Sequence, residues 1–119
     1  MAEPYSDALP ADGPLLFVSG QEPEGPDGDV EGDVTGQTRQ IFQNMTAILG
    51  RHGADLSHVV KMTYFLRHIT DLDEFHGALS ACLPQGHRPA ATLVEVNGLL
   101  DPRYLVEIEA VACLPRAYT

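Results

Sequence analysis

The sequence predicts a single α+β domain in which a mixed β-sheet carries two helices on one face. The 119 residues fit one domain and leave little room for a second, so residues 1–119 are assigned to one unit. Apolar residues make up 44% of the chain, an ordinary share for a protein with a buried core. The hydrophobic pattern alternates between a strand-like and a helical period, which predicts the element order β-β-α-β-α-β-β.

The N-terminal third is expected to form two strands and a long loop. The apolar run Leu15–Ser19, closed by Gly20, is typical of a buried strand. Before it, residues 5–9 are predicted as a short strand, joined to the next one by a hairpin turn at residues 11–14. Residues 22–33 contain several prolines and glycines and indicate an irregular loop.

Two helices and an intervening strand are expected in the middle of the chain. A stripe of apolar residues with a 3.6-residue period predicts a helix over residues 34–49, which Gly50 ends. Residues 59–66 are β-branched and aromatic and indicate a strand. A second helix is predicted from residues 70–73, where acidic side chains stand in the first turn, and it stops before Pro84.

Two strands are expected at the C-terminal end, over residues 92–96 and 104–114. In the longer one, Glu107 and Glu109 lie on the face opposite to a row of aliphatic side chains. Two helices cover only one face of such a sheet, and a domain of this size has a limited core of its own. Another copy of the chain is therefore the expected cover of the second face.

The charge and the cysteines of the chain argue against several partners and sites. Seventeen acidic against seven basic side chains give a net charge of -10, which disfavours nucleic acid and membrane surfaces as partners. No apolar run approaches the roughly 20 residues that span a bilayer, and the first residues do not resemble a signal peptide. Cys82 and Cys113 have no metal-ligand spacing and are expected to be buried and reduced. A cytoplasmic protein without a metal is expected.

Six short stretches, taken in order, resemble the Rid (YjgF/YER057c, RidA-like) superfamily over residues 4 to about 114. They are Pro4–Ala8, Leu16–Gln21, Thr38–Gln40 with Asn44, Val59–Leu66, Pro89–Ala90 with Val94–Val96, and Val106–Ala112. The resemblance implies a chorismate-mutase-like homotrimer with the sheets inside, the helices outside and three clefts between subunits. It also implies an enzyme: deaminase members hydrolyse imines and enamines such as 2-aminoacrylate to keto acids and ammonia. They do so without a cofactor.

One residue of this chain departs from the deaminase pattern. The resemblance implies an arginine that holds the substrate carboxylate, in a Pro-Ala-Arg-Ser segment, but this chain has Ala91 at that position, followed by Thr92. A methyl group cannot replace the bidentate grip of a guanidinium on a carboxylate. Arg88 and Arg103 remain as alternative cations if their loops reach the cleft.

Glu107 is the first candidate for catalysis, because it matches the acidic residue that the family carries on its last strand. A carboxylate in a buried strand needs a partner or a raised pKa, and both are common at functional sites. The alternative is a carboxylate satisfied by backbone amides. His76 lies on the second helix, where many family members have asparagine, and is either a new general acid or base or an exposed helix histidine.

The substrate-binding candidates come from three places in the sequence. Tyr5 matches the pocket tyrosine of the family, with an anchoring aromatic residue as the alternative. Ser19 and Gly20 end a strand and offer a hydroxyl and an uncrowded backbone amide, although a plain turn explains them too. Ala91 and Thr92 complete the set through their place in the active-site strand of the family.

These observations favour a Rid-type small-molecule enzyme that acts on a reactive imine, enamine or related carbonyl compound. Hydrolysis, and thus deamination, by acid-base chemistry through Glu107 is the most concrete form of this hypothesis. Two alternatives stay open: a homologue without the arginine that tautomerises, cyclises or condenses an intermediate of a specialised biosynthetic pathway, and a non-catalytic trimer that binds a metabolite. Ribonuclease activity fits the negative charge badly.

Overall fold

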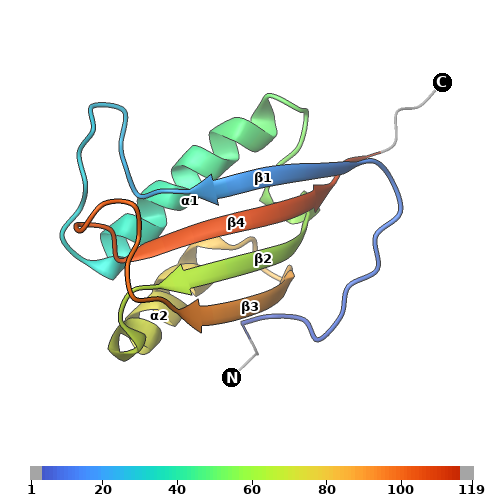
Figure 1. The fold of residues 1–119 in the computed structure, drawn as a ribbon. Helices are drawn as coiled ribbons and strands as arrows, with labels where there is room; N and C mark the ends of the chain where they lie inside the picture. The colour runs from blue at the N-terminus through green and yellow to red at the C-terminus, as the bar shows by residue number, and fades with distance from the viewer. Residues whose placement is uncertain (1–3, 116–119) are drawn as a thin grey trace.

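A four-stranded mixed sheet with two helices on one face organises the chain in the computed structural model, which describes residues 4–115 (Figure 1). The strands lie side by side in the order β1 (Leu15–Gln21), β4 (Val106–Cys113), β2 (Val59–Leu66) and β3 (Ala90–Glu95). β2 and β3 run parallel, and the other neighbouring pairs are antiparallel. The predicted α+β class is confirmed.

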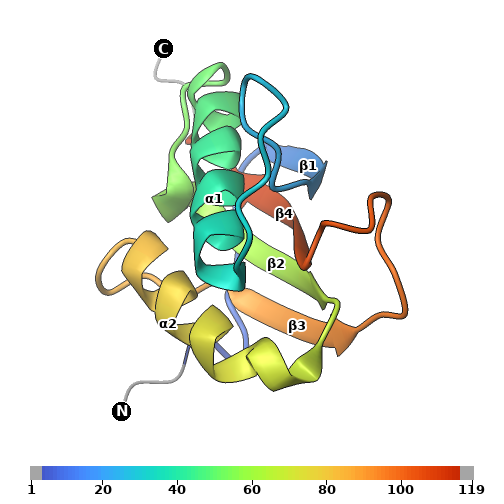
Figure 2. The ribbon, with the colours of Figure 1, turned by 90° about the vertical axis from the view of Figure 1, so that its left-hand side faces the viewer.

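The two helices, α1 (Val34–Gly50) and α2 (Leu72–Cys82), pack against the same face of the sheet (Figure 2). Asp33 caps α1, since its side chain accepts a hydrogen bond of 2.8 Å from the backbone amide of Gly36. The predicted apolar stripe of α1 is buried except for Ile48, which is half-buried. In α2, the ring of Phe75 meets Tyr64 of β2 edge-on, with 5.1 Å between ring centroids. The core therefore lies between the helices and the sheet.

The predicted first strand and its hairpin are wrong. Residues 5–9 form no strand; instead, Ser6 makes an isolated parallel bridge to Ala90 at the outer edge of β3. The chain then crosses to β1 at the opposite edge of the sheet (Figure 1). The local sequence pattern of residues 5–9 indicates extended backbone, but it does not indicate the strand with which this segment pairs. In addition, Pro10 and Pro14 lack the backbone donors that a hairpin ladder would use.

The cysteine prediction is wrong in part. Cys82 and Cys113 are both free, but each side chain is only half-buried. Cys82 lies on the edge of the α2 stripe that faces α1, and Cys113 lies on the sheet face away from the helices. Within residues 4–115, neither helix combines the length and hydrophobicity that crossing a lipid bilayer requires.

The face of the sheet opposite to the helices, called the open face below, is left uncovered by residues 4–115 (Figure 2). Large apolar side chains are exposed on it: Phe17 is 74%, Leu15 51% and Val94 40% exposed. Glu107 and Glu109 also lie there, because their β4 neighbours of even number point into the core. An exposed apolar sheet face beside carboxylates is the main surface feature that the fold presents.

Candidate functional site

A buried amide on α1 fixes the segment that leads into β4. The side chain of Gln37 is fully buried, and its Nε2 donates to the carbonyl oxygens of Glu31 at 2.8 Å and Arg103 at 2.9 Å. Its Oε1 accepts from the backbone amide of Leu105 at 2.7 Å. Both amide protons and the carbonyl oxygen are thus paired. The chain two residues before Glu107 is held against α1 by this one side chain.

Replacing Gln37 by leucine is expected to lower the free energy of unfolding by at least about 1–3 kcal/mol, because backbone groups that the amide satisfies lose their partner. Chemical denaturation measures the effect. Gln43→Leu is the matched control: this glutamine lies on the same helix but is exposed, and its replacement should change stability by no more than about 0.5 kcal/mol. Equal losses in the two variants would contradict the anchoring role.

Two further side-chain amides on α1, those of Gln40 and Asn44, fix the loop that follows β1. Asn44 Nδ2 donates to the carbonyl oxygens of Glu22 at 3.1 Å and Glu24 at 3.0 Å, and its Oδ1 accepts from Gln40 Nε2 at 2.9 Å. The Tyr104 hydroxyl donates to the Glu24 carboxylate at 2.9 Å. The loop is therefore tied to the helix side and to the start of β4, which keeps its acidic residues close to the end of β1.

Glu107 is a half-buried carboxylate on the open face. Burial raises its pKa, and the nearby charges of Glu22 and Glu109 raise it further. No arginine or lysine charge in the described part of the chain contributes to the pKa of Glu107, whereas a carboxylate held in an ion pair has its pKa lowered by its cationic partner. Glu107 thus keeps its proton to higher pH than an ordinary glutamate and is suited to give and take a proton.

Gly20 makes the space that the Glu107 carboxylate occupies. The pairing of β1 with β4 is irregular between Val18 and Gln21, and Gly20 lies within this bulge. A methyl group at Gly20 would overlap the carboxylate oxygen of Glu107 and would lie 3.0 Å from its Cδ. The structure therefore brings together two of the predicted site residues, Gly20 and Glu107. Ser19 precedes Gly20 and is exposed.

A separate pocket lies on the helix side, between α2 and β3. This aromatic pocket has a volume of about 230 Å³. It brings together three predicted site residues, Tyr5, His76 and Ala91. The full set of lining residues is Pro4, Tyr5, Tyr64, Leu72, His76, Leu79, Ala91 and Leu93. His76 therefore lines a pocket on the inner side of α2, together with Tyr5 and Ala91.

Thr92 does not belong to the aromatic pocket. Adjacent strand residues point to opposite faces, so Thr92 lies on the open face while Ala91 faces α2. The Thr92 hydroxyl accepts a hydrogen bond of 2.8 Å from Lys61 Nζ. Thr92 is thus paired with a lysine on a surface that the Ala91 side chain does not reach.

Sequence reasoning missed Tyr64, which lines the aromatic pocket from β2. The residue is 3% exposed, and its hydroxyl donates to Met62 Sδ at 3.4 Å. Burial raises the pKa of this phenol, with a small opposing effect from Arg88. The available signal was a tyrosine at a core position of a strand, since a buried hydroxyl needs a partner.

Neither alternative arginine reaches the aromatic pocket of its own chain. Arg103 is exposed and forms a two-pronged pair with Asp101, through Nε at 3.1 Å and an Nη at 2.9 Å. These hydrogen bonds lower the pKa of Asp101 to about 2. An Nη of Arg88 donates to the carbonyl oxygens of Pro84 at 3.1 Å and His87 at 2.8 Å. Neither guanidinium lines the aromatic pocket.

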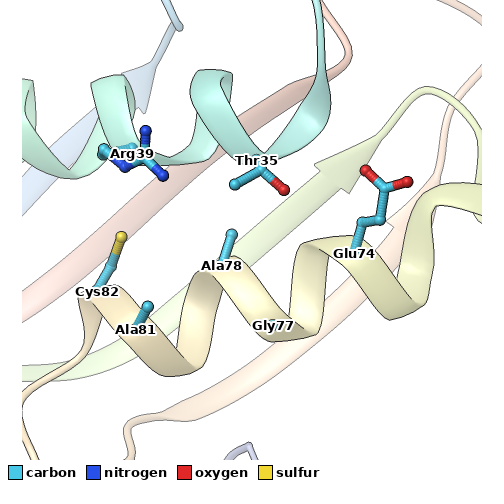
Figure 3. Close-up of a pocket in the computed structure, with 7 residues that line it drawn as sticks. All are labelled: Thr35, Arg39, Glu74, Gly77, Ala78, Ala81 and Cys82. Carbon is cyan, nitrogen blue, oxygen red and sulfur yellow. The ribbon is translucent and has the colours of Figure 1, made fainter.

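Another pocket, of about 200 Å³, lies between α1 and α2 on the outer side of the molecule. Figure 3 shows Thr35 and Arg39 of α1 facing Ala78 and Cys82 of α2 across it. Burial raises the pKa of the Cys82 thiol, which makes it a poor nucleophile at neutral pH. None of the predicted site residues lies here.

The candidate residues thus form two groups that the sheet separates. Gly20 and Glu107 lie on the open face, whereas Tyr5, His76 and Ala91 lie on the helix side at the β3 edge. β2 stands between β4 and β3 in the strand order. One chain alone does not join the carboxylate to the aromatic pocket.

Comparison with known proteins gives consistent likenesses. The family model described as Endoribonuclease L-PSP matches residues 1–114. A RutC family protein from Pyrococcus horikoshii is 39% identical over 111 residues, which cover 92% of this chain and 86% of the relative. A solved YjgF-family protein from Neisseria meningitidis has a TM-score of 0.79 at 31% identity, covering 98% of this chain and 92% of that one. A Rid-family structure from Yersinia pestis has a TM-score of 0.82 at 26% identity, covering 92% and 86%.

Proposed function

This chain belongs to the YjgF/Rid family, and we propose that it is a small-molecule enzyme that hydrolyses a reactive imine or enamine to a carbonyl compound and ammonia. One observation carries the proposal: the half-buried Glu107 carboxylate, with its raised pKa, lies over the space that Gly20 leaves free. A group that keeps its proton to higher pH than an ordinary glutamate and lies at an open surface is suited to acid-base catalysis.

The proposed reaction uses one water and one carboxyl group. Protonated Glu107 donates its proton to the imine nitrogen, and the resulting carboxylate takes a proton from the water that attacks the imine carbon. Glu107, protonated again by that water, then donates its proton to the carbinolamine nitrogen, and ammonia leaves. The hydroxyl proton of the carbinolamine passes back to the Glu107 carboxylate as the carbonyl group forms, so Glu107 ends the cycle protonated. No cofactor enters this balance.

We propose a homotrimer in which the open faces of the sheets meet. Exposed Phe17, Leu15 and Val94 favour burial against other copies, and the charge of -10 disfavours nucleic acid as the partner despite the name of the matching family model. A trimer would place the Glu107 group of one chain beside the aromatic pocket of its neighbour. We also propose a cytoplasmic location.

The assembly is tested by light scattering. The protein is expected to have roughly three times the chain mass of 12.9 kDa at micromolar concentration. Phe17→Asp, which puts a charge on the proposed interface, should shift the mass towards that of one chain. A monomer in the unchanged protein would rule out the proposed assembly.

The activity is tested by measuring ammonia and carbonyl release from a panel of imines that an amino-acid or amine oxidase generates in situ. Release faster than in buffer, in proportion to protein concentration, is the expected result. An intact trimer that accelerates no member of the panel would contradict the hydrolase.

Gly20→Ala is expected to lower the hydrolysis rate by roughly 10²-fold, because the new methyl group displaces the Glu107 carboxylate from the reacting position. The fold should persist, since the clash involves the end of a flexible side chain. Gly32→Ala is the matched control, because a Cβ there meets nothing within 4 Å. Rates of Gly20→Ala equal to those of the control would show that the position of Glu107 is unimportant.

The second candidate is a non-hydrolytic enzyme, such as a tautomerase or cyclase. Ala91 in the aromatic pocket favours it, because a site without the carboxylate-binding arginine is free to serve a different substrate. Such an enzyme would change an imine or enamine without releasing ammonia. A protein that binds the compound and changes nothing would instead be a metabolite-binding trimer.

A further inference from the structure

The aromatic pocket offers a ligand no carboxylate, ammonium or guanidinium group among the described residues. Among residues 4–115, no lysine, arginine, aspartate or glutamate side chain lines it. The lining instead supplies two tyrosines, one histidine and aliphatic side chains. Its volume is about 230 Å³, whereas an apolar cavity of about 150 Å³ accommodates benzene. The pocket therefore has room for a substituted ring or an aliphatic group of similar size.

The Tyr64 hydroxyl is a buried polar group of this pocket that donates to a weak acceptor. It is deeply buried, and the acceptor that it reaches is the thioether sulfur of Met62, at 3.4 Å. A thioether is a weak acceptor, and a buried hydroxyl without a good partner is costly. Burial also keeps the phenol protonated, so Tyr64 acts as a donor and not as a base.

A carboxylate is a poor ligand for the same pocket. Moving it from water into apolar surroundings is strongly unfavourable unless a well-placed cation pairs with it, and the single imidazole of His76 does not offer the bidentate pairing of a guanidinium. The guanidinium of Arg88 is near enough to influence Tyr64, but it donates to the carbonyl oxygens of Pro84 and His87. In the lining, Ala91 occupies the position at which the family resemblance implies an arginine.

We propose that the aromatic pocket binds the uncharged aromatic or apolar end of the substrate, with Tyr64 donating a hydrogen bond to its carbonyl oxygen or imine nitrogen. The proposal rests on the proposed function in that it names the substrate class of that enzyme: neutral ketimines, aldimines and their carbonyl products, in place of imino acids. Tyr64 is then the residue that selects a ligand with a hydrogen-bond acceptor.

Three probes of similar size test the proposal by equilibrium binding to the whole, assembled protein, followed by NMR of ¹⁵N-labelled chain. Acetophenone has a ring and an acceptor, ethylbenzene has the ring alone, and benzoate has the ring and a charge. Acetophenone is expected to shift the amide signals of Tyr64 and Leu93 and to bind about tenfold or more tightly than benzoate. Benzoate binding as tightly as acetophenone would overturn the proposal, and so would the absence of acetophenone binding.

Tyr64→Phe separates the hydroxyl from the ring. The variant is expected to bind acetophenone roughly 2- to 10-fold more weakly and ethylbenzene as well as before. Unchanged ethylbenzene binding shows that the pocket is still folded. Tyr104→Phe is the matched control, because its hydroxyl bonds to Glu24 away from the pocket, and it should change neither affinity. Equal losses for both probes, or no loss for acetophenone, would overturn the role of Tyr64.

These measurements do not depend on catalysis. Acetophenone binding through Tyr64 in a protein that hydrolyses no imine would refute the hydrolase and leave the pocket assignment standing. Hydrolysis of imino acids with no preference for neutral probes would refute the pocket assignment and leave the hydrolase standing.

Discussion

Glu107→Gln is expected to lower imine hydrolysis by roughly 10²–10⁴-fold, the usual contribution of a positioned general acid or base. Glutamine has nearly the same shape as glutamate and fits the space above Gly20, but it neither donates a carboxyl proton nor accepts one from water. Initial rates of ammonia release at saturating imine measure the loss. Glu109→Gln is the matched control, because it removes an exposed carboxylate from the same face of the same strand.

The stability of the Glu107→Gln variant provides an independent check. A carboxyl group whose pKa is raised in the folded protein holds its proton more tightly there than in the unfolded chain. Its ionisation therefore opposes folding as the pH rises from the ordinary glutamate pKa to the raised one. Since glutamine does not titrate, the variant should be at least as stable as the natural chain at neutral pH. A marked loss of stability would assign Glu107 a structural role and weaken the catalytic one.

Ala91→Arg is expected to raise hydrolysis of the imino acids 2-aminoacrylate and 2-iminopropionate by roughly 10- to 150-fold, from a low starting rate. A charge-assisted hydrogen bond to a carboxylate contributes about 1.5–3 kcal/mol, and Ala91 already lines the pocket that would hold the substrate. Rates measured with and without the substitution give the gain. Glu107→Gln added to Ala91→Arg should remove it.

Ala91→Leu controls for bulk, since it fills the pocket without adding a charge and should give no gain. Fast hydrolysis of imino acids by the natural chain would show that another cation has replaced the arginine, and Arg88→Ala and Arg103→Ala would identify it. If the natural chain and Ala91→Arg are both inactive while the trimer is intact, the tautomerase, cyclase or binding protein becomes the better account.

The helices and most strands could be predicted because their signals are local. Ile41, Met45 and Leu49 repeat at the helical period and are fully buried in α1, and the strand at residues 59–66 ends where the sequence indicated. The segment around Ser6 could not be predicted, because its pairing with Ala90 joins residues 84 positions apart and leaves no local mark. The last two strands were predicted at residues 92–96 and 104–114, and their observed ends differ from these by one or two residues.

The sequence provided candidate residues for a site but not their arrangement in space. Family resemblance selected Tyr5, Gly20, Ala91 and Glu107, and the structure places these residues in two groups. Strand alternation alone predicts that Ala91 and Thr92 cannot share a pocket. Tyr64 was missed because, in an alternating strand, its sequence position is that of an ordinary core residue. Its significance follows from the weak thioether acceptor of its hydroxyl, which only a structure shows.

The sheet that separates Glu107 from the aromatic pocket has a genetic consequence. If each cleft takes its carboxylate from one chain and its pocket from the next, an allele damaged at Glu107 and an allele damaged at the pocket are defective in different halves. Mixed trimers would then contain some clefts built from two intact halves. Two alleles that are each inactive alone would restore activity when expressed together, whereas two alleles damaged on the same side of the sheet would not.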